Sequence, residues 1–162
     1  MTIKIIITGG TIDKEYDPQD QEFELKKSHI RTMLREGRFS SSIKINTLMF
    51  KDSLDMNLKD REKIIKECKQ AKQKMIVITH GTDTMVETAK VLGKNINEKT
   101  IVLTGAMQPA VLEKTDALFN LGGAIIAVQT LPTGVYIAMN GKIFMWDNVK
   151  KNISKSQFEK LK

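Results

Sequence analysis

The strongest constraint on the fold is a recurring pattern in which a short apolar run ends in a polar, glycine-containing turn. In the clearest copy, residues 75–78 are apolar, His80-Gly81-Thr82-Asp83-Thr84 follows, and a run with helical spacing comes next. A buried parallel strand that feeds a helix has this pattern. Thr84 and Glu87, three residues apart, predict a capping box at the start of the helix. The alternative for Thr82 and Asp83 is that they only cap this helix.

The same alternation of strands and helices continues along the chain. We expect strands at residues 3–7, 43–48, 75–78, 101–103 and 135–139, and helices at residues 28–37, 58–72, 84–93 and 116–128, the last with Asp116 as N-cap. The polar stretch 13–27 is expected to be a loop, of the kind that often forms a lid, and the tail 154–162 a final helical turn or two. The predicted fold is one α/β domain over residues 1–162. It has a doubly wound, mainly parallel sheet with helices on both faces, Rossmann-like or flavodoxin-like.

Size, charge and composition narrow the class of protein. With 162 residues, 41% of them hydrophobic, the chain can form one domain with a core. Its net charge is +7, but the lysines between residues 59 and 74 alternate with acidic residues, which favours a solvated helix face over nucleic-acid binding. The single cysteine, Cys68, allows no intramolecular disulfide, and we expect it to be a small buried hydrophobic residue. No apolar run is long enough to span a membrane, and the first residues do not resemble a signal peptide, so a cytoplasmic protein is expected.

Hydroxyl, carboxylate and amine side chains follow the predicted strands. Because the carboxyl ends of parallel strands share one edge of the sheet, ligands usually bind there. A threonine hydroxyl on this edge could attack a carbonyl if a base lies within hydrogen-bond reach, and a buried lysine can serve because desolvation lowers the pKa of a lysine. The glycines of the edge would offer backbone N–H groups to an oxyanion. The alternative is that all are ordinary turn residues, since spacing alone cannot bring them together. The residues concerned are Thr11, Ser53, Thr82, Asp83 and Lys151.

Two threonine motifs carry a resemblance to a known family. Thr8-Gly9-Gly10-Thr11-Ile12 and His80-Gly81-Thr82-Asp83-Thr84-Met85 resemble the bacterial-type L-asparaginase (asparaginase/glutaminase) family. Residues 52–57 and 104–109 match the family in order and spacing. The similarity covers essentially the whole chain but only the larger, N-terminal domain of the family. The chain given ends at Lys162, before the family's C-terminal domain, which is therefore expected to be absent.

The resemblance implies hydrolysis of asparagine to aspartate and ammonia through an acyl-enzyme on threonine, with no cofactor and no metal. Thr11 matches the nucleophile, and Thr82 matches a second catalytic threonine that is coupled to a lysine and an aspartate, matched by Lys151 and Asp83. Lys150 is adjacent, so a shift of one residue would exchange the two lysines. Tyr16 is the candidate for the lid tyrosine. The residues matched to substrate binding are Ser53 for the α-carboxylate, Asp83 for the α-amino group, Thr82, and Gly10 and Ala106 as pocket lining.

Departures from the family leave three hypotheses. Leu54 stands where the family commonly has a polar residue that holds the substrate, so asparagine specificity should be weak. The first hypothesis is an amidohydrolase acting on asparagine or a related small amide, as a homo-oligomer (dimer or tetramer) in which another subunit covers the site. The second is a non-catalytic amino-acid sensor, which predicts stabilisation by ligand without turnover. The third is an amidotransferase-like component that supplies ammonia to a partner and shows salt-sensitive RNA binding.

Overall fold

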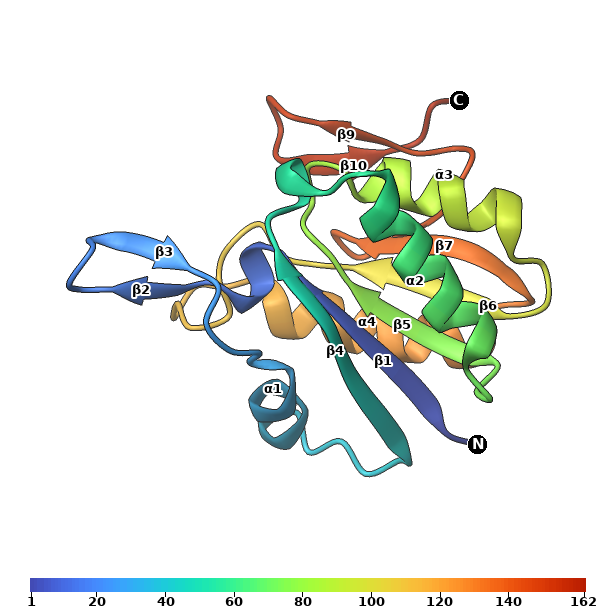
Figure 1. Ribbon diagram of the computed structural model, residues 1–162, viewed down its shortest axis with the longest axis horizontal. Helices are drawn as coiled ribbons and strands as arrows, with labels where there is room; N and C mark the ends of the chain where they lie inside the picture. Colours follow the sequence, from blue (N-terminus) through green and yellow to red (C-terminus); the bar gives the residue numbers. More distant parts are fainter.

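A six-stranded sheet forms the centre of the computed structural model, which describes residues 1–162 (Figure 1). Its strands lie in the order β4-β1-β5-β6-β7-β8. The first five are parallel, and β8 is antiparallel to β7 at one edge. The mainly parallel sheet is therefore confirmed. The strands are β1 (Ile3–Gly9), β4 (Ile43–Lys51), β5 (Met75–Thr79), β6 (Thr100–Thr104), β7 (Gly134–Met139) and β8 (Lys142–Met145).

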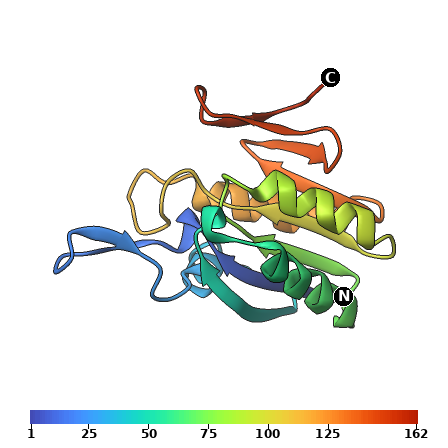
Figure 2. The same ribbon diagram turned by 45° about the horizontal axis from the view of Figure 1, so that its top comes forward.

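Helices cover both faces of this sheet, as predicted (Figure 2). Helices α1 (Ile30–Glu36) and α4 (Ala117–Thr130) pack on one face, and α2 (Leu58–Gln70) and α3 (Met85–Asn95) on the other. The chain-order ranks of the five parallel strands, read across the sheet, are 2-1-3-4-5, which is the flavodoxin-like arrangement. In that arrangement the ligand site lies where the chain reverses its direction across the sheet, between β1 and β5. None of the helices has the length and apolar character needed to cross a membrane.

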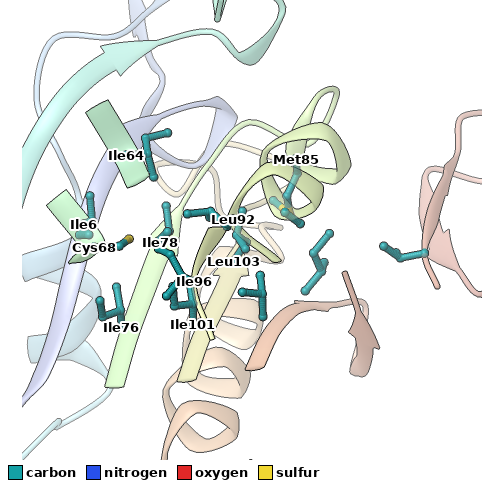
Figure 3. Packing of buried hydrophobic residues seen from close by; sticks show 14 of the residues in the cluster. Ile6, Ile64, Cys68, Ile76, Ile78, Met85, Leu92, Ile96, Ile101 and Leu103 are labelled. Atoms are coloured by element: carbon teal, nitrogen blue, oxygen red, sulfur yellow. The ribbon is translucent and has the colours of Figure 1, made fainter. Parts of the chain in front are cut away.

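The core between the sheet and helices α2 and α3 is built from branched aliphatic side chains (Figure 3). Each fully buried isoleucine contributes about 1.5–3 kcal/mol relative to exposure. Cys68 of α2 lies in this cluster, and burial raises the pKa of its thiol to about 12. The thiol is therefore a packing group, as the sequence indicated. The labelled members are Ile6, Ile64, Cys68, Ile76, Ile78, Met85, Leu92, Ile96, Ile101 and Leu103.

The predicted end of the third helix at Gly93 is wrong. Helix α3 continues to Asn95, and Gly93 lies inside it under the indole of Trp146. A Cβ added at Gly93 would come within 2.3 Å of that ring. The glycine therefore provides space for the chain after β8 rather than a helix stop.

Two short hairpins replace a predicted loop and a predicted helical tail. In the polar stretch 13–27, β2 (Glu15–Asp17) pairs with β3 (Glu22–Glu24), and the hairpin projects from the body of the molecule (Figure 1). Near the C-terminus, β9 (Lys150–Asn152) pairs with β10 (Gln157–Glu159) where helical turns were expected. The tail has one large buried apolar residue, Phe158, which is too little for an apolar helix face. In the hairpin, Phe158 instead packs into the core beside α3.

Candidate active site

A lysine, a threonine and an aspartate meet at the carboxyl edge of the sheet. The Lys151 Nζ donates hydrogen bonds to Thr82 Oγ1 at 2.8 Å and to Asp83 Oδ1 at 2.6 Å. The Lys151 side chain is only 16% exposed, whereas that of Asp83 is 46% exposed. Thr82 and Asp83 follow β5, and Lys151 lies on β9, so the fold brings together residues that the sequence could only suggest as a set.

The C-terminal hairpin decides which of two adjacent lysines reaches the threonine. Successive side chains of a strand point to opposite sides. On β9, Lys151 points to Thr82, while the Lys150 Nζ lies 3.3 Å from Glu159 Oε1 on β10. The hairpin is fastened where Phe158 N donates to Asn140 Oδ1 at 2.8 Å. The geometry thus selects Lys151 of the two lysines.

Glycines allow the loops after β1, β4 and β5 to touch. Gly10 has φ +86°, and a Cβ there would lie 2.3 Å from Gly81 N. A Cβ at Gly81 would lie 2.6 Å from Ser53 Oγ. These contacts place the Thr11, Ser53 and Thr82 segments at one edge. The Gly10 N–H, however, donates to Lys51 O at 2.9 Å, so the expectation that this glycine offers its N–H to an oxyanion is wrong.

Ser53 is buried and held from the start of α3. Its Oγ accepts a hydrogen bond from Thr84 N at 3.2 Å, and its carbonyl oxygen accepts one from Thr84 Oγ1 at 2.7 Å. The Thr84 hydroxyl therefore braces the Ser53 turn (η2, Ser53–Asp55), and the capping box predicted with Glu87 does not form. Next to Ser53, the Lys14 ammonium lies 2.7 Å from Asp52 Oδ2 and holds the pKa of Asp52 below its usual range.

Thr11 begins a 3₁₀ turn (η1, Thr11–Asp13) at the base of the projecting hairpin. Its side chain is partly exposed, and its hydroxyl takes no part in the hydrogen bonds that join Thr82, Asp83 and Lys151. Asp13 is buried, and this desolvation raises the pKa of its carboxyl. The Asp13 Oδ1 accepts hydrogen bonds from His29 N at 2.8 Å and Ser28 Oγ at 3.1 Å, which ties the two ends of the hairpin segment together.

The remaining predicted residues are not in the lysine–threonine cluster. Tyr16 lies on β2, is 51% exposed, and packs edge-on against Phe23 with ring centroids 5.6 Å apart. Ala106 is buried in the loop after β6. The Asp116 carboxylate accepts hydrogen bonds from Met107 N and Gln108 N of that loop, each at 3.0 Å. Asp116 does stand at the N-cap position of α4, but its side chain braces the loop and makes no capping bond.

Sequence reasoning missed three buried polar residues beneath the site. His80 is fully buried, with Nδ1 2.7 Å from Gly81 O and Nε2 2.8 Å from Thr88 Oγ1. Burial lowers the pKa of His80 to about 4. Arg61 donates from Nε to Thr88 Oγ1 at 3.1 Å. Arg61 lies three residues before Ile64 and seven before Cys68, so its place on the inward face of α2 was a signal that could have revealed it.

The only carboxylate cluster with the spacing of a metal site lies on the projecting hairpin. One oxygen each from Asp17, Asp20 and Glu24 lies within 4.8 Å of the others. Lys26 forms ion pairs with Asp17 and Glu24, so this cluster is already neutralised in part. The absence of a metal and a cofactor from the reaction stays a prediction.

The fold and this edge define a flavodoxin-like α/β domain with a threonine–lysine–aspartate cluster at the carboxyl edge of its sheet. The chain belongs to the asparaginase family, because residues 2–159 match the family model described as "Asparaginase, N-terminal". The resemblance carried by the two threonine motifs is thereby confirmed.

Individual relatives agree with this assignment. The chain is 34% identical to the probable periplasmic L-asparaginase of Haemophilus influenzae, over 92% of this chain and 46% of the relative. Among solved structures, the thermostable L-asparaginase from Thermococcus kodakarensis superposes with a TM-score of 0.84 at 28% identity, over 99% of this chain and 51% of that one. A probable cytoplasmic L-asparaginase from Campylobacter jejuni gives a TM-score of 0.83 at 30% identity, over 98% and 52%. The chain spans about half the length of the curated relatives it matches.

Proposed function

We propose that the protein is an amidohydrolase that converts asparagine or a related small amide to the acid and ammonia through a threonine acyl-enzyme. The observation that carries this proposal is the contact of Lys151 Nζ with Thr82 Oγ1 at 2.8 Å and with Asp83 Oδ1 at 2.6 Å. A hydroxyl in contact with an amine that a carboxylate orients can take a proton from a nucleophile and pass it to a leaving group. Similarity to proteins named L-asparaginase supports the amide as substrate.

In the proposed reaction, Thr11 is the nucleophile. Its oxygen bonds to the amide carbon, and its proton passes to the Thr82–Lys151 pair. The pair then gives this proton to the leaving nitrogen as the C–N bond breaks and ammonia departs. In the second half, the same pair takes a proton from water, which attacks the ester, and the proton returns to the Thr11 oxygen. Asp83 orients Lys151 throughout.

Substrate recognition is proposed to rest on the loops after β4 and β5. Ser53 is assigned to the substrate carboxylate. Asp83, whose second carboxylate oxygen accepts no hydrogen bond from Lys151, is assigned to the substrate amino group. Thr82, Gly10 and Ala106 line the pocket. Leu54 is 71% exposed and offers no hydrogen bond from its side chain, so we expect weak discrimination between asparagine and other small amides.

Ammonia release with a pair of lysine variants tests the proposal. The wild type should release ammonia from asparagine, glutamine or another small amide. Lys151→Met should lower kcat by a factor on the order of 10²–10⁴, because a positioned acid–base group supplies about that much. The matched control is Lys150→Met, which removes an exposed ion pair with Glu159 and should keep activity within about twofold of wild type.

The other outcomes of this assay are decisive. Full activity in Lys151→Met would refute the proposed role of that lysine. A wild type that hydrolyses no amide would refute the amidohydrolase. In that case stabilisation by asparagine would favour the sensor, and salt-sensitive RNA binding would favour the ammonia-supplying component.

Assembly and location stay predictions. A homo-oligomer, dimer or tetramer, is supported by the outer face of α4, which contains no charged residue and leaves Phe119 68% and Ile126 62% exposed. Sedimentation equilibrium would measure the number of subunits. The names of the relatives do not agree on the location, since one is named as periplasmic and another as cytoplasmic, and we keep the cytoplasm as the proposed location.

A further inference from the structure

A chain of buried polar groups runs from α2 to the backbone just before Thr82. Arg61 Nε donates to Thr88 Oγ1 at 3.1 Å, Thr88 Oγ1 contacts His80 Nε2 at 2.8 Å, and His80 Nδ1 contacts Gly81 O at 2.7 Å. Arg61 is 9% exposed, and Thr88 and His80 are fully buried. The Gly81 carbonyl belongs to the peptide bond whose nitrogen is that of Thr82, so the array ends on the catalytic segment.

The donor and the acceptor of each hydrogen bond in this array are fixed. The Gly81 carbonyl oxygen can only accept, so the neutral imidazole carries its proton on Nδ1 and donates it to Gly81 O. His80 Nε2 is then an acceptor and receives the Thr88 hydrogen, while the Thr88 oxygen accepts from Arg61, whose guanidinium can only donate. A flipped ring or the other tautomer would leave buried donors and acceptors without partners, which is costly. The array therefore holds one orientation of the His80 ring.

The other end of the array reaches the substrate-binding turn. The Arg61 guanidinium also donates from Nη1 to Met56 O at 3.2 Å. Met56 closes the Ser53 turn, where its N–H donates to Ser53 O at 3.2 Å. Arg61 forms no ion pair, so these hydrogen bonds are what holds its buried charge. One arginine thus connects the Ser53 turn with the Gly81–Thr82 peptide.

We propose that Arg61, Thr88 and His80 are positioning residues that fix the Gly81–Thr82 peptide, and with it the Thr82 hydroxyl, relative to Ser53. The catalytic consequence rests on the proposed function. The effect on the His80 ring and on the Thr82 peptide is independent of the proposed function, because both can be measured without turnover. A buried polar network that only stabilised the fold would leave the activity of each folded molecule unchanged.

The first test is kinetic and uses two substitutions of Thr88. Thr88→Val keeps the shape of the side chain and removes the hydroxyl, whereas Thr88→Ser keeps the hydroxyl. With the amide that the wild type turns over fastest, Thr88→Val should lower kcat about ten- to hundredfold, since small misplacements of catalytic groups have effects of that size. KM should change less than about threefold, because Thr84 still holds Ser53. Thr88→Ser should restore most of kcat.

The second test is spectroscopic and needs no substrate. The chain has only two histidines, His29 and His80, so a His29→Gln variant assigns the imidazole ¹⁵N signals. Wild type and Thr88→Ser should show His80 protonated on Nδ1 alone. In Thr88→Val the ring signals should change, and the backbone amide of Thr82 should shift and exchange faster with solvent.

The two tests separate the possible failures. If Thr88→Val keeps the wild-type His80 signals and Thr82 amide, the positioning role is refuted, whatever the activity. If kcat per folded molecule is unchanged while only the melting temperature falls, the array is structural and the proposal is also refuted. If the wild type hydrolyses no amide, the proposed function fails, and the spectroscopic test still decides whether the array fixes the peptide.

Discussion

At the residue scale, glycines in this chain have opposite structural roles. Gly10 has φ +86° and faces the Gly81 backbone, whereas Gly122 lies inside α4 with no atom within 4 Å of an added Cβ. Gly10→Ala should destabilise the domain and abolish ammonia release, because the Cβ meets backbone that cannot move aside. Gly122→Ala should stabilise it by about 0.5–1 kcal/mol, since alanine favours a helix. Thermal unfolding of both variants measures this, and an active Gly10→Ala protein of wild-type stability would contradict the proposed packing of the loops.

Most residues of the site could be located from the sequence because each lies in the turn or loop after a predicted strand. Thr11, Ser53 and Thr82 are of this kind, and parallel strands bring their carboxyl ends to one edge. The choice between Lys150 and Lys151 could not be made that way, because it depends on the register of a hairpin with almost no apolar pattern. Arg61 was missed for a different reason. Its helix contains many lysines, so a further basic residue was interpreted as part of the solvated face, although the spacing of Arg61 places it on the inward face.

At the element scale, the C-terminal hairpin places Lys151 beside Thr82. The buried aromatic residue of this hairpin should therefore contribute more to stability and activity than the aromatic residue of the projecting hairpin. Phe158, opposite Lys151 in the β9–β10 pairing, is fully buried, whereas Phe23 on β3 is 43% exposed. Phe158→Ala should lower the free energy of unfolding by about 3–5 kcal/mol and reduce ammonia release with it. The matched change Phe23→Ala should cost no more than about 1.5 kcal/mol, the scale of an exposed aromatic pair.

Urea unfolding followed by tryptophan emission measures both changes. Trp146 is the single tryptophan and precedes the hairpin, so its emission reports on this part of the fold. Equal losses of stability in the two variants would contradict a docked C-terminal hairpin.

The parallel strands and the helices were predictable, and the hairpins were not, for a physical reason. A strand buried on both faces is a nearly continuous β-branched run such as residues 3–7, in which Lys4 is the one polar residue, and an amphipathic helix has a regular spacing. The β2–β3 and β9–β10 pairs have three residues per strand, mostly polar, and the β9–β10 pair is joined to the core by the tertiary packing of Phe158. Local pattern carries little information about such contacts.

At the scale of the whole molecule, the buried His80 makes stability depend on pH. Burial lowers the pKa of His80 from its ordinary value of 6.5 to about 4 in the folded protein. Between these values the unfolded chain binds a proton that the folded chain does not, so stability rises with pH. The contribution of His80 is therefore fully present above about pH 6.5 and is lost as the pH falls towards 4. By pH 5 the loss should reach about 2 kcal/mol.

A His80→Gln variant isolates this effect from that of the carboxylates. Urea unfolding at pH 7.5 and pH 5 should show a larger loss of stability in the wild type than in the variant, by about 2 kcal/mol. Equal losses in the two proteins would show that His80 is not held neutral in the fold.

The central claim is that an amide is hydrolysed through an acyl group on threonine, and trapping that acyl group tests it most directly. The protein would be mixed with asparagine, or with the small amide it turns over fastest, quenched in acid within one turnover, and analysed by peptide mass spectrometry. We expect the acyl group on Thr11, its absence from Thr11→Val, and its slower decay in Thr82→Val, where the group that activates water is impaired. Turnover with no acyl group on any threonine, or with one on another residue, would contradict the account.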